Sequence, residues 1–197
     1  MSRKNSETRK RILECTWKLL EDEPGSATRM SDIAKAAGIS RQAVYLHFPT
    51  RAELLVATTR HLDEVKDVDA RLAKSRAATT GEERLEAFIE AWGNYIPEIY
   101  GVAKALLAMK DTDEEAGAAW ADRMQAVRHG CEAVVKALRK DGHLTKNLTS
   151  QQSIEALWAL LSVRHWEQLV VECGWSQKQY IKHMNRMARA MLVDGDQ

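Results

Sequence analysis

The sequence predicts an all-α protein of about nine helices. Residues that favour helices, chiefly Ala, Leu, Glu, Lys, Arg and Met, dominate the composition, and aromatic residues make up only 6%. Three prolines in 197 residues leave long stretches uninterrupted. Apolar side chains recur three and four residues apart in one segment after another, which is the spacing of helices with one buried face. No strand and no internal repeat is predicted.

The first helix is expected over about residues 6–21. Leu13, Trp17 and Leu20 give it one apolar stripe, and the breaking residues Pro24 and Gly25 follow it.

Residues 30–48 are predicted to form two short helices joined by a tight turn. The buried face of the first is made by Ile33, Ala34 and Ala37. Gly38 supplies the backbone freedom that a sharp turn needs. Ser40 is a suitable N-cap for the second helix, because its hydroxyl can accept a backbone N–H.

The second helix of this pair presents polar side chains on its outer faces. Val44 and Phe48, four residues apart, form its inward stripe. The other positions carry hydrogen-bonding side chains: Arg41, Gln42, Tyr45 and His47. A short helix that packs through two residues and exposes such groups is typical of a DNA recognition helix.

A capping box predicts a sharp start for the next helix. Thr50 can cap the N–H of Glu53 while Glu53 reaches back, and Pro49 ends the preceding helix. We expect this helix to run from Arg51 to about Ala73.

Four further segments complete the chain. Helical spacing covers residues 82–109, where Pro97 is expected to kink or break the helix. A long amphipathic helix is expected to follow and to end near Gly142. Residues 150–173 are apolar on more than one face, which predicts a helix buried on all sides. The last helix is expected to end near Leu192. Capping boxes precede both of these helices, at Thr149–Gln152 and Ser176–Gln179.

The charge distribution is uneven between the two ends of the chain. Residues 1–60 carry 11 Lys and Arg against 7 Asp and Glu, whereas residues 61–197 carry 18 against 21. The positive bias of the first part suits phosphate binding, although charge alone decides little.

Cysteine usage and the lack of long apolar runs indicate a cytoplasmic protein. Cys15, Cys131 and Cys173 are far apart and fall in helical patterns, so we expect buried thiols in a reducing compartment. We expect no metal, no cofactor, no signal peptide and no membrane contact.

Residues 8–55 resemble the N-terminal domain of the TetR family of transcriptional regulators. The resemblance rests on Ile12-Leu13, Asp32-Ile33-Ala34, Ala37-Gly38-Ile39-Ser40, Val44-Tyr45, His47-Phe48-Pro49 and Glu53-Leu54-Leu55. It covers about a quarter of the chain. It implies a three-helix helix-turn-helix DNA-binding domain over residues 1–50, and a larger helical effector-binding and dimerisation domain over residues 51–197. It also implies a homodimer, held through the last two helices, that acts as a repressor on a near-palindromic operator and is released by a small molecule.

The resemblance and the outward positions together assign roles at the DNA. Gln42 is expected to pair with adenine and Arg41 to read guanine or hold a phosphate, while Ala43 is small enough to approach the groove or a thymine methyl group. Contacts to the DNA backbone are expected from Tyr45, His47, Thr50 and Arg51, with Lys35 and Arg29 flanking them. The competing interpretation is that some of these residues belong to solvated helix faces.

The effector site is less defined. The helices that enclose the family's pocket carry these aromatic and Met side chains: Trp92, Tyr95, Tyr100, Met109, Trp120, Met124, Trp158 and Trp166. For each of them taken singly, ordinary core packing is the favoured explanation over ligand binding. Arg164 and His165 interrupt an apolar helix. They are expected either to pair with acidic residues across the dimer or to contact a polar group of the ligand.

The sequence argues against an enzyme. It has no Gly-rich phosphate loop after a strand and no Ser, His and carboxylate set at recognised spacing. His61 and Glu64 are expected to be only a solvated pair. The alternative from a different class is an all-α protein that binds or sequesters a small molecule and does not read DNA.

Overall fold

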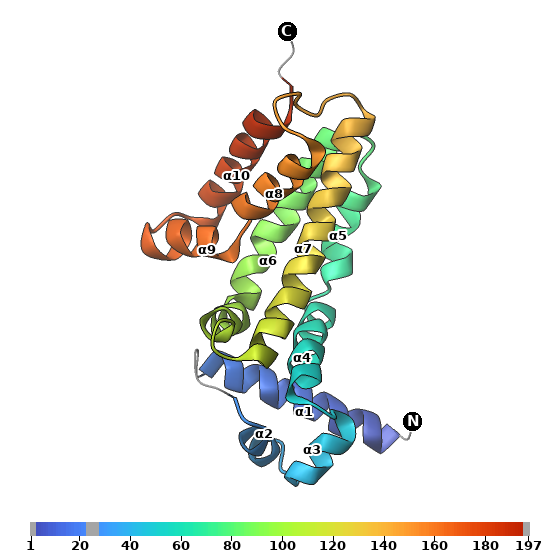
Figure 1. Ribbon diagram of the computed structural model, residues 1–197, viewed down its shortest axis with the longest axis vertical. Helices are drawn as coiled ribbons and strands as arrows, with labels where there is room; N and C mark the ends of the chain where they lie inside the picture. The colour runs from blue at the N-terminus through green and yellow to red at the C-terminus, as the bar shows by residue number, and fades with distance from the viewer. Residues whose placement is uncertain (1–2, 23–27, 195–197) are drawn as a thin grey trace. The chain divides into compact units, whose positions relative to one another are not determined.

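The computed structural model describes residues 3–22 and 28–194, and these are mostly helical, as the sequence predicts (Figure 1). The only β-type pairing among them is an isolated antiparallel bridge between Leu144 and Val193. The helices are α1 (Arg3–Asp22), α2 (Met30–Ala36), α3 (Arg41–His47), α4 (Arg51–Val65), α5 (Val68–Ala77), α6 (Gly81–Met109), α7 (Glu114–Lys140), α8 (Ser150–Leu160), α9 (Val163–Trp166), the π-helical turn η1 (Glu167–Glu172) and α10 (Gln177–Leu192). The loop predicted at Pro24 lies outside the described residues.

Two of the predicted helix boundaries were wrong near the start of the chain. α1 begins at Arg3 instead of Ser6. The helix expected from Arg51 to Ala73 is divided into α4 and α5 at Asp67. Asp67 adopts φ 51° and ψ 52°, a left-handed conformation that Asp tolerates better than most residues, and its carboxylate accepts the N–H of Ala70 at 3.3 Å.

Pro97 does not divide its helix. α6 runs through Pro97 for 29 residues, so of the two expected outcomes a break did not occur. The missing proline N–H costs one backbone hydrogen bond, which the long flanking helix tolerates.

The single helix predicted over 150–173 is interrupted after Leu160. Ser162 caps a new helix by accepting the N–H of His165 at 3.2 Å. The interruption frees the carbonyl of Leu161, and the indole N–H of Trp92 donates to it at 2.7 Å. A serine inside an apolar run can therefore start a new helix, because its side chain competes for the backbone.

The chain forms two compact units that are described separately. One comprises Met1–Lys66 with Ile99–Met124, and the other Asp67–Glu98 with Gln125–Gln197. The functional division at residue 51 stays a prediction.

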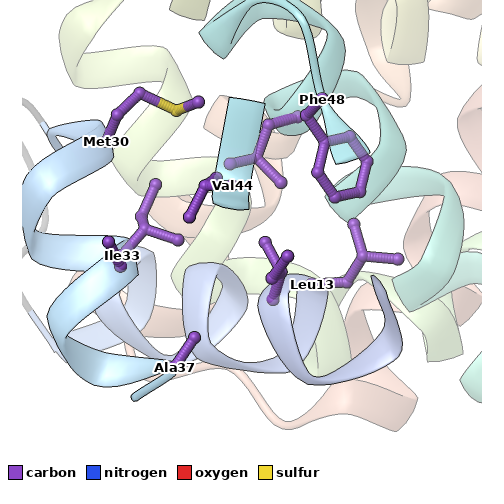
Figure 2. Packing of buried hydrophobic residues seen from close by; sticks show 9 residues of the cluster. Leu13, Met30, Ile33, Ala37, Val44 and Phe48 are labelled. Carbon is purple, nitrogen blue, oxygen red and sulfur yellow. The ribbon is translucent and has the colours of Figure 1, made fainter. Parts of the chain in front are cut away.

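The first unit has two apolar clusters. One joins α1, α2 and α3 to the start of α4, and Figure 2 shows Leu13, Ile33, Val44 and Phe48 meeting within it. Val44 and Phe48 are 0% and 2% exposed, which confirms the predicted inward stripe of α3. The second cluster joins α1, α4, α6 and α7, and includes Leu20, Leu55, Leu62, Leu106 and Met109. A fully buried apolar side chain such as Val44 or Phe48 contributes about 1.5–3 kcal/mol to stability, so the first cluster fixes the position of α3.

The second unit includes α10, which packs through one face. Its buried stripe consists of Tyr180, Met184, Ala188 and Leu192. The two capping boxes predicted before α8 and α10 are present, at Thr149–Gln152 and Ser176–Gln179. Cys131 is buried as expected, and burial raises the pKa of its thiol to about 12, whereas Cys15 is half-buried and Cys173 is exposed.

Candidate nucleic-acid interface

The turn between α2 and α3 has the geometry that its residues predict. Gly38 adopts φ +64°, a conformation that costs glycine little. The N–H of Ile39 returns to the carbonyl of Ala34 at 3.0 Å, which closes the end of α2. The hydroxyl of Ser40 accepts the N–H of Ala43 at 3.1 Å and so begins α3.

The outer face of α3 is open to solvent. Arg41 and Gln42 are exposed, Tyr45 is 38% exposed, and the predicted residues Ala43 and His47 are half-buried. Leu46, which was not among the predicted DNA contacts, is 83% exposed. The helix thus packs through Val44 and leaves the opposite side free to enter a groove.

Arg41 and Tyr45 contact each other along one side of α3. The guanidinium lies 5.5 Å from the ring centre of Tyr45 and donates a 3.3 Å hydrogen bond to its hydroxyl. Pairs four residues apart on a helix commonly meet in this way. The contact fixes both side chains at the surface, with donors left for an external partner.

The flanking candidates lie in the same unit. Arg29 and Lys35 are exposed on either end of α2. Thr50 is exposed and accepts the N–H of Glu53 at 3.1 Å, so it caps α4 as predicted. Arg9 of α1, which was not predicted, lies 4.7 Å from the ring centre of Phe48.

Arg51 differs from the other candidates, because its side chain is engaged inside the protein. Its side chain is 12% exposed, and its guanidinium lies 2.9 Å from the carboxylate of Asp113 and 3.2 Å from that of Glu115. Its Nε donates to the carbonyl of Thr28 at 2.6 Å. These contacts join the residues before α2 to the starts of α4 and α7, and they favour a structural role for Arg51 over a phosphate contact.

The two acidic residues also serve the ends of α4 and α7. Glu115 accepts the N–H of Ala52 at 3.1 Å, and Asp113 accepts that of Ala116 at 3.1 Å. Carboxylates are favoured at helix N-termini by the helix dipole. We call Arg51, Asp113 and Glu115 the ionic clamp. The acidic half of the clamp was not predicted, since Asp113 and Glu115 lie over 60 positions from Arg51 in the sequence.

The clamp predicts a specific response to acid. Burial disfavours the charged form of Asp113, but hydrogen bonds from Arg51 and the Ala116 N–H outweigh it and lower the pKa of Asp113. A lowered folded-state pKa means that this stabilisation is present above about pH 4 and is lost as pH falls through the folded value. The difference in melting temperature between wild type and Asp113→Asn should therefore be largest near neutral pH and should shrink below pH 4. A difference that stays constant across this range would show that the Asp113 charge contributes nothing.

The candidate effector residues occur in both units. In the first, Met109 is buried and Trp120 packs against the same apolar cluster, while Met124 is half-buried. In the second, the rings of Trp92 and Tyr95 lie 6.0 Å apart, and Arg128 lies 5.9 Å from the ring of Trp158. The indole N–H of Trp92 is satisfied by a backbone carbonyl, which is typical of a structural residue.

Arg164 and His165 have partners within the chain. Arg164 is 65% exposed and lies 3.2 Å from Glu167, and the Nδ1 of His165 lies 2.9 Å from the carbonyl of Leu160. The burial from which a ligand or dimer contact was argued is therefore absent for Arg164. His61 also departs from expectation, because it is 9% exposed and lies only 3.7 Å from Glu64, so the pair is not fully solvated.

Other kinds of site find no support in the described part of the chain. No group of three or more His, Cys, Asp and Glu residues within it could hold a metal ion. Over the same residues, no helix is both long and apolar enough to cross a bilayer.

The packed α1–α3 core, the tight turn and the exposed polar face of α3 define a helix-turn-helix DNA-binding protein. The profile of the family described as "Bacterial regulatory proteins, tetR family" matches residues 12–58, which include all of this motif. Residues 12–58 therefore carry a DNA-binding domain of the kind found in the TetR family of transcriptional regulators. Similarity to DNA-binding transcriptional regulators agrees with the expectation that the chain is not an enzyme.

Relatives and solved structures extend the similarity beyond the motif. The chain is 28% identical over 151 residues to the HTH-type transcriptional regulator EthR of Mycobacterium tuberculosis, and the aligned region covers 74% of this chain and 68% of EthR. A structure from Saccharomonospora viridis described as a transcriptional regulator in complex with choline has a TM-score of 0.74 at 21% identity, covering 96% of this chain and 100% of that one. NalD, the secondary repressor of the MexAB-OprM efflux pump in Pseudomonas aeruginosa, has a TM-score of 0.70 at 21% identity over 96% and 98% of the two chains.

Proposed function

We propose that this protein is a dimeric transcriptional repressor that binds a near-palindromic operator and is released by a small molecule. The observation that carries the proposal is α3, a short helix anchored by Val44 and Phe48 with its opposite face exposed. A protein that only sequesters a small molecule has no need of such a face, so the alternative is disfavoured. A chromosomal operator as partner implies a cytoplasmic location.

The residues of α3 divide the recognition task. Gln42 reads adenine, because its amide can donate and accept at the base edge, and Arg41 reads guanine or holds a phosphate. Ala43 permits close approach to the groove. Tyr45 and His47 contact the DNA backbone and so position the helix without reading sequence. Thr50, Arg29 and Lys35 add contacts at the edges of this surface.

The homodimer is held through α8 and α10. Met187 is 42% exposed on α10, beside the buried stripe, and the half-buried Met191 extends the same flank. On α8, Ile154, Trp158 and Leu160 are also only partly buried. Four such helices, two from each chain, can bury these surfaces as a bundle.

The effector binds within the region 51–197, and apolar and aromatic side chains there favour a flat or greasy ligand. Met109 and Trp120 belong to the cluster shared by α4, α6 and α7, so a ligand that repacks this cluster acts directly on α4. Arg164 and His165 are left out of this lining in our proposal because their side chains have partners within the chain.

Binding to the DNA upstream of the protein's own gene tests the proposal. We expect protection of a near-palindrome, with affinity that falls steeply as salt rises because phosphate contacts release counterions. Retention no stronger than on random DNA would rule out a sequence-specific regulator.

Two substitutions in α3 should have different effects. Tyr45→Phe keeps the ring but removes the hydroxyl, and should weaken binding to all sequences to a similar degree. Gln42→Ala should lower affinity for the operator by about 10- to 100-fold at each half-site and relax the preference at particular base pairs. Competition binding against a set of operators with single base-pair changes measures both. Equal, uniform losses from both variants would contradict these roles.

A further inference from the structure

Leu46 is an apolar residue in the middle of a polar surface. It is 83% exposed, whereas the other large apolar residues with substantial exposure in the described chain, Tyr45, Val65, Val171 and Met187, range from 38% to 54%. A single exposed leucine is ordinary on a protein surface. Its position on α3 is what gives it a specific meaning.

Leu46 lies on the most outward ridge of α3. Successive helical residues turn by about 100°, so both Gln42 and Leu46 point away from the buried Val44, and they lie about 40° apart around the axis. They are also four residues apart, which separates them by about 6 Å along the helix. A groove that receives Gln42 therefore receives Leu46 as well.

The major groove offers one apolar feature to such a side chain, the C5-methyl group of thymine. We propose that Leu46 is a specificity-determining residue that packs against a thymine methyl in each half-site, about two base-pair steps from the base read by Gln42. The contact removes apolar surface of both groups from water, and so favours thymine over cytosine or uracil at that position. This inference rests on the proposed DNA-binding function and adds a base preference that the polar residues do not supply.

Replacement of thymine by deoxyuridine tests this directly, since it deletes only the methyl group. Each thymine of the operator is changed in turn, symmetrically in both half-sites, and the affinity of wild type and Leu46→Ala is measured by fluorescence anisotropy. For wild type we expect that replacing thymine by deoxyuridine at one position lowers affinity by about fourfold per half-site, which corresponds to the loss of one buried methyl group. For Leu46→Ala the same position should have no effect. Val65→Ala, which removes an exposed apolar side chain of α4, should keep the wild-type profile.

The other outcomes overturn the proposal in distinguishable ways. Wild-type affinity and an unchanged thymine profile for Leu46→Ala would show that Leu46 does not touch DNA. A uniform loss with the thymine profile retained would assign Leu46 to the sugar-phosphate backbone. If the wild-type protein binds no operator, the proposed function fails together with this inference. Leu46→Ala is not expected to unfold the protein, because the side chain is exposed and Ala favours helix.

Discussion

Replacement of Arg51 by methionine is expected to destabilise the protein and to weaken operator binding by about tenfold or more, although Arg51 does not touch DNA in our interpretation. Methionine keeps the apolar stem but removes the guanidinium that bonds Thr28, Asp113 and Glu115. Two partly buried carboxylates then face each other without a counter-charge. We expect the free energy of unfolding in urea to fall by about 2–3 kcal/mol. Affinity falls because the contact to Thr28 no longer fixes the start of α2 against α4, and small errors in position are costly for recognition.

The salt dependence of binding separates this role from a phosphate contact. Loss of a phosphate contact in each half-site lowers the slope of log affinity against log salt by about 0.9 per contact, or roughly two for the dimer. Loss of the clamp leaves the slope unchanged. Asp113→Asn should then lower stability and operator affinity as Arg51→Met does. The double variant should bind the operator no more weakly than whichever single variant binds it more weakly, because both substitutions remove the same interaction. If Arg51 instead bound a phosphate, the Asp113→Asn protein should bind the operator with wild-type or higher affinity.

Arg60→Met provides the matched control. Arg60 also lies on α4 and bonds an acidic residue of α7, Asp122, at 2.7 Å, but its side chain is 59% exposed. Exposed pairs of this kind contribute about 0–1 kcal/mol, so stability and affinity should change little. A loss as large as that of Arg51→Met would mean that any ion pair between α4 and α7 matters, and not the clamp.

The recognition motif was predictable because its determinants are local. The turn at Gly38, the cap at Ser40 and the inward pair Val44 and Phe48 all lie within residues 38–48, so spacing alone carries the information. The same reasoning located the capping boxes before α8 and α10.

The clamp and two helix interruptions were not predictable in this way. Arg51 could be recognised as a cation at a helix start, but its acidic partners are 62 and 64 residues away, and only the fold brings them together. At Asp67 and Ser162 a side chain competes with the backbone, and the apolar pattern continues past the interruption. The periodicity of apolar residues indicates which face of a helix is buried, but it does not indicate where the helix is interrupted.

Replacement of Met187 by glutamate is expected to convert the dimer to a monomer and to abolish high-affinity operator binding. The side chain is 42% exposed in the single chain, so a charge there should leave the fold intact but be costly in an apolar interface. A monomer engages only one half-site, which forfeits the gain from two linked sites, about 10²- to 10⁴-fold. Light scattering after gel filtration measures the mass, and anisotropy measures binding to full and half operators.

The half operator makes this result specific to assembly. Met187→Glu should bind a single half-site as the wild type does, since α3 is untouched, and its melting transition should remain cooperative. Val65→Glu, which places the same charge at a 52% exposed valine of α4, should remain dimeric. A Met187→Glu protein that stays dimeric at micromolar concentration with full affinity would place the interface away from this flank of α10. Loss of half-site binding as well would show that the substitution disturbs the fold, and Met187→Lys would then serve as a second variant, because the neighbouring exposed positions of α10 already carry Lys182, Arg186 and Arg189.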